Sequence, residues 1–263
     1  MDLGIRGRTA LVGGASSGLG LAIAEALASE GADLVLTARR AEVLLEVAAD
    51  LAARHGIRVE TIAADFATPD AGGQIAQRAT DLMGTIDIVV LNAGGPPPVD
   101  PTATDPEAWA RALQILVMTP IAIATALIPP MRERGWGRIV AVGSYAVRQP
   151  VDELAYSNAG RSALMAWLKT ASRAVAADGV TINGAFPGRH ATARIEALDR
   201  ATAERTGASL EAVRAAHLAA IPAGRYGRPD EFAAYVTYLC SERASYQTGT
   251  FTTIDGGLVA GLP

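Results

Sequence analysis

The sequence has little cysteine, few histidines and no excess of positive charge. Its 263 residues contain one cysteine, Cys240, which excludes an internal disulfide and a cysteine-rich metal site. We expect Cys240 to be a buried thiol in a helix. The formal net charge of −4 excludes the basic surface that nucleic-acid binding requires. None of the three histidines has the spacing of a metal ligand set, so we expect no metal.

A long unbroken apolar segment is also missing. The N-terminus lacks the basic stretch and apolar core of a secretory signal, and we expect a cytoplasmic protein. Residues 115–131 carry no charge, but Pro120, Pro129 and Pro130 interrupt them. We therefore expect a buried helix and no membrane partner. A helix that is apolar around most of its circumference also predicts a homo-oligomer, a dimer or a tetramer.

Apolar runs typical of strands alternate with helical patterns along the whole chain. The predicted strands are 9–13, 33–37, 58–63, 86–91, 137–143, 179–185 and 250–254. The clearest helices are 19–29, 41–54, 106–134, 154–177 and 229–241. Right-handed βαβ crossovers then predict one α/β domain over residues 1–263: a Rossmann-type, doubly wound parallel sheet of about seven strands with helices on both faces.

Residues 189–220 interrupt this alternation between the sixth and seventh strands. The segment is polar, alanine-rich and helical in pattern. Two interpretations remain open, a lid over a substrate and a plain surface insertion.

The stretch Thr-Ala-Leu-Val-Gly-Gly-Ala-Ser-Ser-Gly-Leu-Gly at 9–20 passes from a strand through a glycine-rich turn into a helix. Glycines at 14, 18 and 20 allow a sharp turn and a close backbone approach to a ligand. The free N–H groups and the positive dipole end of the helix attract a pyrophosphate. The pattern therefore predicts dinucleotide binding at the carboxyl ends of the strands.

Several further motifs resemble those of the short-chain dehydrogenase/reductases, from about Gly7 to Leu258. They are Gly-Gly-Ala-Ser-Ser-Gly-Leu-Gly at 13–20, Ala-Asp-Phe at 64–66, Leu-Asn-Ala-Gly-Gly at 91–95, Phe-Pro-Gly at 186–188 and Ile-Asp-Gly-Gly at 254–257. The resemblance implies nicotinamide binding and hydride transfer. It also implies that the cofactor contacts Gly14, Ser16, Ser17, Gly18, Leu19, Asp65, Phe66, Asn92, Ala93, Gly94, Pro187, Gly188 and Thr192.

The end of the second predicted strand favours NADP(H) over NAD(H). An acidic residue there would pair with a free ribose 2′-hydroxyl, whereas basic residues would pair with a 2′-phosphate. This strand ends in Arg39 and Arg40, whose guanidiniums can bind a phosphate in a bidentate manner.

The family's catalytic Asn-Ser-Tyr-Lys group is incomplete. By resemblance Ser144 and Tyr156 take the serine and tyrosine roles, while Leu116 stands for the asparagine and Gly160 for the lysine. Because residues at i and i+4 share a helix face, Arg161 is expected to point away from Tyr156. Gly160 is unusual inside a helix and has two interpretations, space that function needs and a tight helix contact. Without a neighbouring ammonium the Tyr156 phenol should stay protonated, which suits carbonyl reduction.

The run Ser-Asn-Ala-Gly-Arg at 157–161 resembles a divergent, oxoacyl-carrier-protein-reductase-like subgroup without a full tetrad. The predicted function is an NADPH-dependent oxidoreductase that reduces a small-molecule ketone or 3-oxoacyl group. Two alternatives stay open, a cofactor-binding protein with little catalysis and a non-redox dehydratase, cyclase or isomerase. Further candidates near the reaction site are Tyr145, Arg148, Arg189 and His190.

Overall fold

A seven-stranded parallel sheet forms the centre of the molecule, with strand order β3-β2-β1-β4-β5-β6-β7. The computed structural model describes residues 2–102 and 105–261. The strands are β1 (Thr9–Gly13), β2 (Asp33–Ala38), β3 (Val59–Ala63), β4 (Ile88–Leu91), β5 (Gly137–Val142), β6 (Val180–Pro187) and β7 (Phe251–Ile254). The predicted Rossmann-type fold is confirmed, and each predicted strand lies within two residues of its observed bounds.

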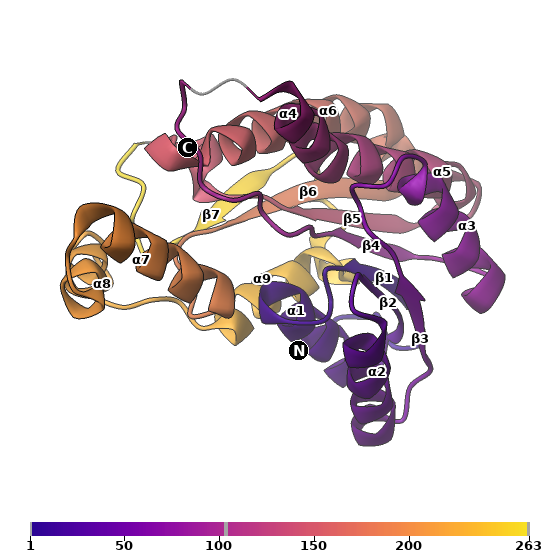
Figure 1. The fold of residues 1–263 in the computed structure, drawn as a ribbon. Helices are drawn as coiled ribbons and strands as arrows, with labels where there is room; N and C mark the ends of the chain where they lie inside the picture. The colour runs from indigo at the N-terminus through magenta and orange to yellow at the C-terminus, as the bar shows by residue number, and fades with distance from the viewer. Residues whose placement is uncertain (1, 103–104, 262–263) are drawn as a thin grey trace.

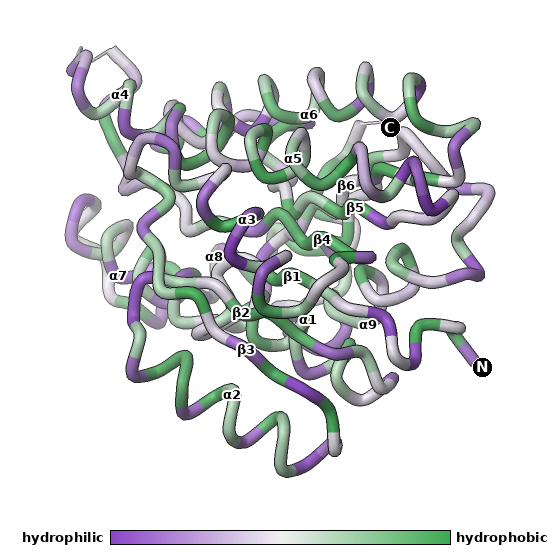
Figure 2. The backbone as a smooth tube through the Cα atoms, turned by 90° about the vertical axis from the view of Figure 1, so that its right-hand side faces the viewer, coloured by the Kyte–Doolittle hydropathy of each residue, from purple (hydrophilic) through white to green (hydrophobic). Residues whose placement is uncertain are grey.

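Helices cover both faces of this sheet, as Figure 1 shows. The helices are α1 (Gly18–Ser29), α2 (Ala41–His55), α3 (Ala71–Met83), α4 (Pro106–Leu113), α5 (Thr119–Glu133), α6 (Ala155–Val175), α7 (Ala193–Thr206), α8 (Leu210–Ala219) and α9 (Pro229–Leu239). α1, α2 and α9 pack on one face, and α3, α5 and α6 pack on the other. The strands are hydrophobic along most of their length (Figure 2), because a parallel sheet between two helical layers is buried on both faces.

The apolar helix of residues 106–133 is continuous rather than broken by its prolines. A π-helical turn, Gln114–Met118, joins α4 to α5 just before Pro120 and widens the backbone there. The residues four positions before Pro129 and Pro130 are exposed, so water can reach the carbonyls that those prolines leave without a donor. In the described part of the chain this is the one helix that is long and apolar enough to cross a membrane, and 39% of its most apolar window is buried. Buried core helices of soluble proteins have the same composition.

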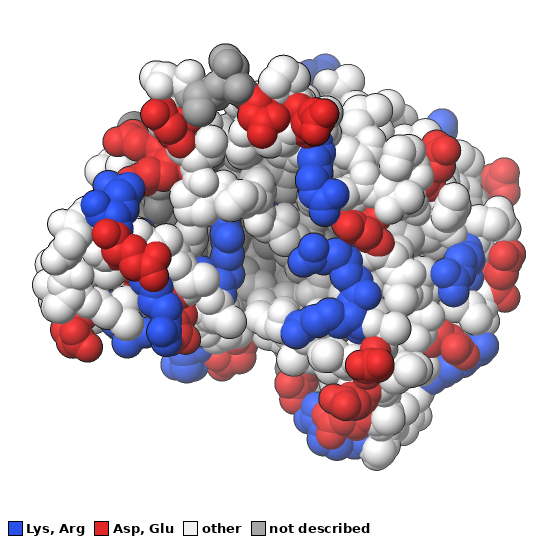
Figure 3. Space-filling model, in the orientation of Figure 1, with Lys and Arg blue, Asp and Glu red and all other residues white. Residues whose placement is uncertain are grey.

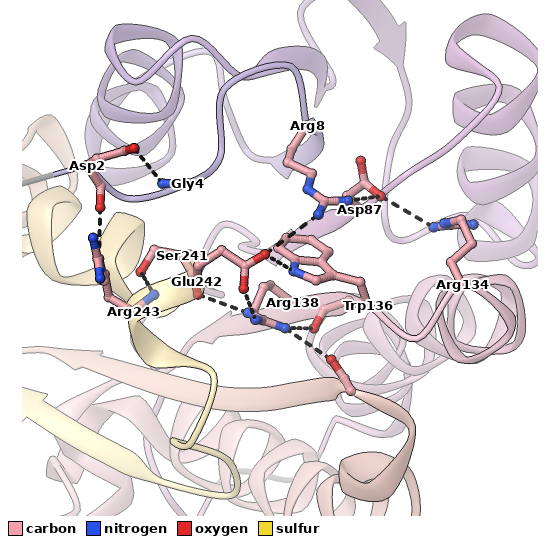
Figure 4. Close-up of polar contacts among 12 residues, drawn as sticks. Asp2, Gly4, Arg8, Asp87, Arg134, Trp136, Arg138, Ser241, Glu242 and Arg243 are labelled. Carbon is pink, nitrogen blue, oxygen red and sulfur yellow. Dashed lines mark hydrogen bonds and ion pairs between the residues drawn. The ribbon is translucent and has the colours of Figure 1, made fainter.

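The amino edge of the sheet is closed by a network of charged side chains (Figure 4). Arg138 on β5 is 2% exposed and donates to the Ser241 carbonyl at 3.0 Å, while its guanidinium lies 4.4 Å from the centre of the Trp136 ring. Trp136 donates through Nε1 to Glu242 at 2.6 Å, and Arg8 stacks on the same ring. These contacts tie β1, β5 and the end of α9 together. Side chains therefore fill the amino edge of the sheet, whereas the opposite, carboxyl edge is hollow.

Cys240, directly after α9, is fully buried as expected, and burial raises the pKa of its thiol to about 12. The segment predicted at 189–220 as a lid or insertion contains α7 and α8. Both helices project from one end of the sheet beside its carboxyl edge (Figure 1).

Candidate active site

A cavity of about 1030 Å³ opens at the carboxyl edge of the sheet, between the strand ends and α7. Figure 3 shows it as a hollow bordered by arginine or lysine side chains. Every residue expected to bind the cofactor lines it, including the glycine-rich turn, Arg39, Arg40 and Thr192. The structure therefore brings together segments that are nearly 180 positions apart in the chain.

Two positions of the glycine-rich turn, Gly14 and Gly20, leave no room for a side chain. Gly14 and Gly18 both have φ of +60°, a conformation that glycine adopts without strain. A Cβ on Gly14 would lie 2.7 Å from the Asn92 amide nitrogen, and one on Gly20 would collide with the Gly14 carbonyl. Asn92 supports the turn by donating from Nδ2 to the Gly13 carbonyl at 3.0 Å. The N-terminus of α1 is thus held open toward the cavity, the geometry that a pyrophosphate needs.

Two arginines stand at the end of β2. Arg40 donates to Ser16 Oγ at 3.1 Å, which ties it to the glycine-rich turn. Arg39 lines the same end of the cavity. Asp65, after β3, pairs with Arg111 at 3.3 Å, and the Ala67 amide and Arg111 lower the pKa of that carboxyl.

Ser144 lies directly after β5 and lines the cavity. Its Oγ accepts a hydrogen bond from the Ala146 amide at 3.1 Å, which orients the hydroxyl at the start of a short 3₁₀ turn. Tyr145 also lines the cavity, where burial raises the pKa of its phenol and the nearby Arg189 guanidinium opposes that shift.

Tyr156 does not lie where the resemblance placed it. Its ring is 4% exposed, packs edge-to-face on Trp109 with centroids 4.6 Å apart, and does not line the cavity. Ser157, the next residue of α6, does line it. One residue turns a helical side chain by roughly 100°, so a one-position difference in register exchanges a phenol for a hydroxyl at the site.

The same shift brings Arg161 to the cavity, and its side chain points away from Tyr156 as expected. Its guanidinium donates to Ser157 Oγ at 3.2 Å, to the Val142 carbonyl at 2.6 Å and to the Ala93 carbonyl at 3.4 Å. Burial lowers its pKa to about 10, and the charge of Arg194 adds to this shift. The spacing Ser157-x-x-x-Arg161, a hydroxyl and a cation one turn apart, was the sequence signal that could have identified this pair.

Gly160 is explained by packing. A Cβ at this position would lie 3.0 Å from Leu116 Cδ1 and 3.1 Å from Leu116 Cβ, and Leu116 itself is 2% exposed. The two residues form a tight contact between α6 and the π-helical turn. Of the two interpretations, the tight helix contact agrees with the structure, and a lysine side chain at 160 would have to displace Leu116.

The remaining candidates have structural partners. Arg189 pairs with the fully buried Asp199 at 3.0 Å, and the same carboxylate accepts from Tyr226 at 2.8 Å and lies 2.9 Å from His217 Nδ1. This buried cluster joins the end of β6 to α7 and α8. Burial lowers the pKa of His217.

His190 and Arg148 also contact the protein interior. His190 lines the cavity but is 3% exposed and packs on Phe232, and burial lowers its pKa. Arg148 donates to the Phe251 carbonyl and does not line the cavity.

The comparisons with known proteins agree with this fold. A family model described as enoyl-(acyl carrier protein) reductase matches residues 14–259. The 3-oxoacyl-(acyl-carrier-protein) reductase FabG of Vibrio cholerae is 31% identical over 97% of this chain and 99% of its own.

Solved structures show the same similarity. The L-sorbose reductase of Gluconobacter frateurii, solved with NADPH and L-sorbose, superposes with a TM-score of 0.93 at 34% identity, and all of both chains is covered. YwfH, an NADPH-dependent reductase involved in bacilysin biosynthesis, gives 0.92 at 26% identity over 97% of this chain and 100% of its own. The chain belongs to the short-chain dehydrogenase/reductase family of oxidoreductases and is of the oxoacyl-carrier-protein-reductase-like type.

Proposed function

We propose that this protein is an NADP(H)-dependent reductase that converts a carbonyl group of a small molecule to an alcohol. One observation carries the proposal: a single cavity contains a phosphate-binding turn with two arginines at one end and two serine hydroxyls beside a guanidinium at the other. Several structurally similar proteins are described as NADPH-dependent or are solved with NADPH.

The residues present fit NADP(H). The bare turn at Gly14 and Gly18, where a Cβ would be strained, leaves the α1 N–H groups accessible to a pyrophosphate. Arg39 and Arg40 have no ion pair to any carboxylate of the described chain, so their charge is available for a 2′-phosphate. When bound, the reduced nicotinamide supplies a hydride.

At the other end, Ser144 and Ser157 provide hydroxyl donors for the carbonyl oxygen, and Arg161 stabilises the negative charge that develops there. Reduction adds a hydride to the carbonyl carbon and a proton to its oxygen. Tyr145, the phenol that lines the cavity, supplies that proton in place of Tyr156. A protonated phenol favours the reductive direction, which was expected from the sequence for Tyr156 and applies here to Tyr145.

The cofactor assignment is tested by fluorescence titration with NADPH and NADH. The double variant Arg39→Gln/Arg40→Gln should raise the Kd for NADPH about tenfold or more and leave that for NADH nearly unchanged, because charge-assisted bonds to a phosphate are lost. Arg78→Gln, an exposed arginine on α3 outside the cavity, is the matched control. Absence of binding of either cofactor contradicts the proposal.

The activity is tested by NADPH consumption with a panel of ketones and 3-oxoacyl thioesters. Substrate-dependent loss of NADPH supports a reductase. Tight NADPH binding without turnover would instead favour a cofactor-binding protein with little catalysis. The observation that favours this alternative is that no Tyr-x-x-x-Lys pair of the described residues lines the cavity.

A further inference from the structure

Positive charge accumulates in the cavity although the chain as a whole is negative. Seven arginines line the cavity: Arg39, Arg40, Arg111, Arg161, Arg189, Arg194 and Arg205. Four carboxylates line it: Asp65, Asp100, Asp152 and Glu153. In a protein of net charge −4 this local excess of guanidiniums indicates anionic ligands.

Three of these arginines already have a carboxylate. The ion pairs are Arg111 with Asp65 at 3.3 Å, Arg189 with Asp199 at 3.0 Å and Arg205 with Glu153 at 2.6 Å. The other four, over residues 2–102 and 105–261, form no ion pair. They fall into two groups, Arg39 with Arg40 and Arg161 with Arg194.

The two groups lie at opposite ends of the cavity. Arg39 and Arg40 follow β2, whereas Arg161 reaches the carbonyl of Val142 at the end of β5. β1 and β4 lie between these strands, so the groups are separated by three strand spacings, roughly 14 Å. The first group has an anion assigned to it, the 2′-phosphate. The pyrophosphate faces the α1 N-terminus, which follows the intervening β1.

No anionic partner has been assigned to the second group, Arg161 and Arg194. Arg194, on the first turn of α7, extends across the cavity and donates to the Pro96 carbonyl at 2.6 Å, and Arg161 bonds only carbonyl and hydroxyl oxygens. Burial lowers the pKa of both guanidiniums, and the charge of Arg194 lowers that of Arg161 further. Two like charges that face one cavity, neither paired with one of its carboxylates, repel each other, and a bound anion would relieve that repulsion.

We propose that Arg161 and Arg194 bind an anionic group of the substrate, so that the physiological substrate is an oxo acid whose carboxylate they hold while Ser144 and Ser157 face its carbonyl oxygen. This inference rests on the proposed function. It makes α7 part of the specificity site, because Arg194 belongs to that helix.

The test uses the NADPH complex and three oxo acids, pyruvate, acetoacetate and levulinate, each matched with its methyl ester. The series places the carboxylate one, two and three bonds from the carbonyl carbon and removes its charge in the ester. Binding is measured by calorimetry, and turnover is measured by NADPH oxidation. At least one acid should bind about tenfold or more tightly than its ester, the size of one lost charge-assisted contact.

Arg194→Gln should abolish this preference for the acid and leave the Kd for NADPH unchanged. Arg200→Gln, an exposed arginine on the same helix that lies outside the cavity, should retain both properties. Three results overturn the inference. No acid binds better than its ester, or the preference for the acid persists in Arg194→Gln. The third is that Arg194→Gln weakens NADPH binding alone, which would assign the Arg194 guanidinium to the cofactor pyrophosphate. Failure of the parent protein to bind NADPH would instead count against the proposed function.

Discussion

Ser157 and Tyr156 are adjacent in the chain and face different surroundings, one the cavity and the other the ring of Trp109. The residue type that carries the chemistry therefore depends on which side of α6 meets the strand ends. Arg161 follows Ser157 by four positions and shares its side of the helix, so the pair acts as one unit.

Ser157→Ala should lower kcat/KM by roughly 10- to 100-fold, because a hydroxyl that donates to the carbonyl oxygen and accepts from a guanidinium is lost. Tyr156→Phe keeps the ring that packs on Trp109 and should change both kcat/KM and the free energy of unfolding little. Steady-state NADPH oxidation and denaturant unfolding of both variants provide the measurement. A severe loss of turnover in Tyr156→Phe with normal Ser157→Ala kinetics would return the catalytic role to the phenol.

At the scale of elements, a buried carboxylate, Asp199, joins the projecting pair α7 and α8 to the end of β6. Asp199 is fully buried, and three side chains from outside α7, those of Arg189, His217 and Tyr226, meet it. A buried carboxylate with such partners ties loops and helices that have little apolar core of their own. The lid interpretation of residues 189–220 remains a prediction.

Asp199→Asn should destabilise this region by about 3 kcal/mol, since it removes the fully buried charge that pairs with the partly buried Arg189 guanidinium. We expect faster hydrogen exchange in α7 and α8, with the central strands less affected. Glu204→Gln is the control, because Glu204 is an exposed carboxylate on the same helix that forms no ion pair among the described residues, and its loss should leave the exchange rates nearly unchanged. Unchanged exchange in Asp199→Asn would show that the cluster does not hold the two helices.

At the scale of the whole molecule, one buried and one partly buried histidine make stability depend on pH. Burial lowers the pKa of both His190 and His217 in the folded state. A histidine whose pKa is lower in the folded than in the unfolded state takes up its proton more readily on unfolding. Its contribution to stability is therefore present above the unfolded pKa and is lost as the pH falls through about 6.5 toward the folded value.

The free energy of unfolding should accordingly decrease between about pH 7.5 and pH 5.5, with a slope of at most about 1.4 kcal/mol per pH unit for each histidine. The double variant His190→Gln/His217→Gln should flatten this slope, as urea unfolding at a series of pH values can measure. An equal slope in the variant would assign the acid sensitivity to other groups.

The homo-oligomer stays a prediction. Met118, in the apolar helix, is exposed, and sedimentation would measure the oligomeric state.

Much of this protein could be read from local pattern. The alternation of apolar runs and helices predicted the strands and a parallel sheet, because a buried parallel strand needs a continuous apolar run and each crossover has one hand. The glycine-rich turn and Arg39 and Arg40 were likewise local signals, since a turn and a strand end depend on neighbouring residues. Every residue expected to contact the cofactor lines the cavity.

The reaction end of the cavity could not be predicted from local sequence pattern and was decided by the tertiary structure. The facing side of α6 is chosen by the fit of Gly160 against Leu116, two residues 44 positions apart. That packing turns Ser157 and Arg161 toward the cavity and Tyr156 toward Trp109. Arg194 likewise enters the cavity only because α7 folds back over the loop after β4. Contacts between distant segments set the rotation of a helix about its axis. The spacing Ser157-x-x-x-Arg161 therefore places the two side chains on one side of α6 but does not say that this side faces the cavity, whereas turns and strand ends are set by residues next to one another.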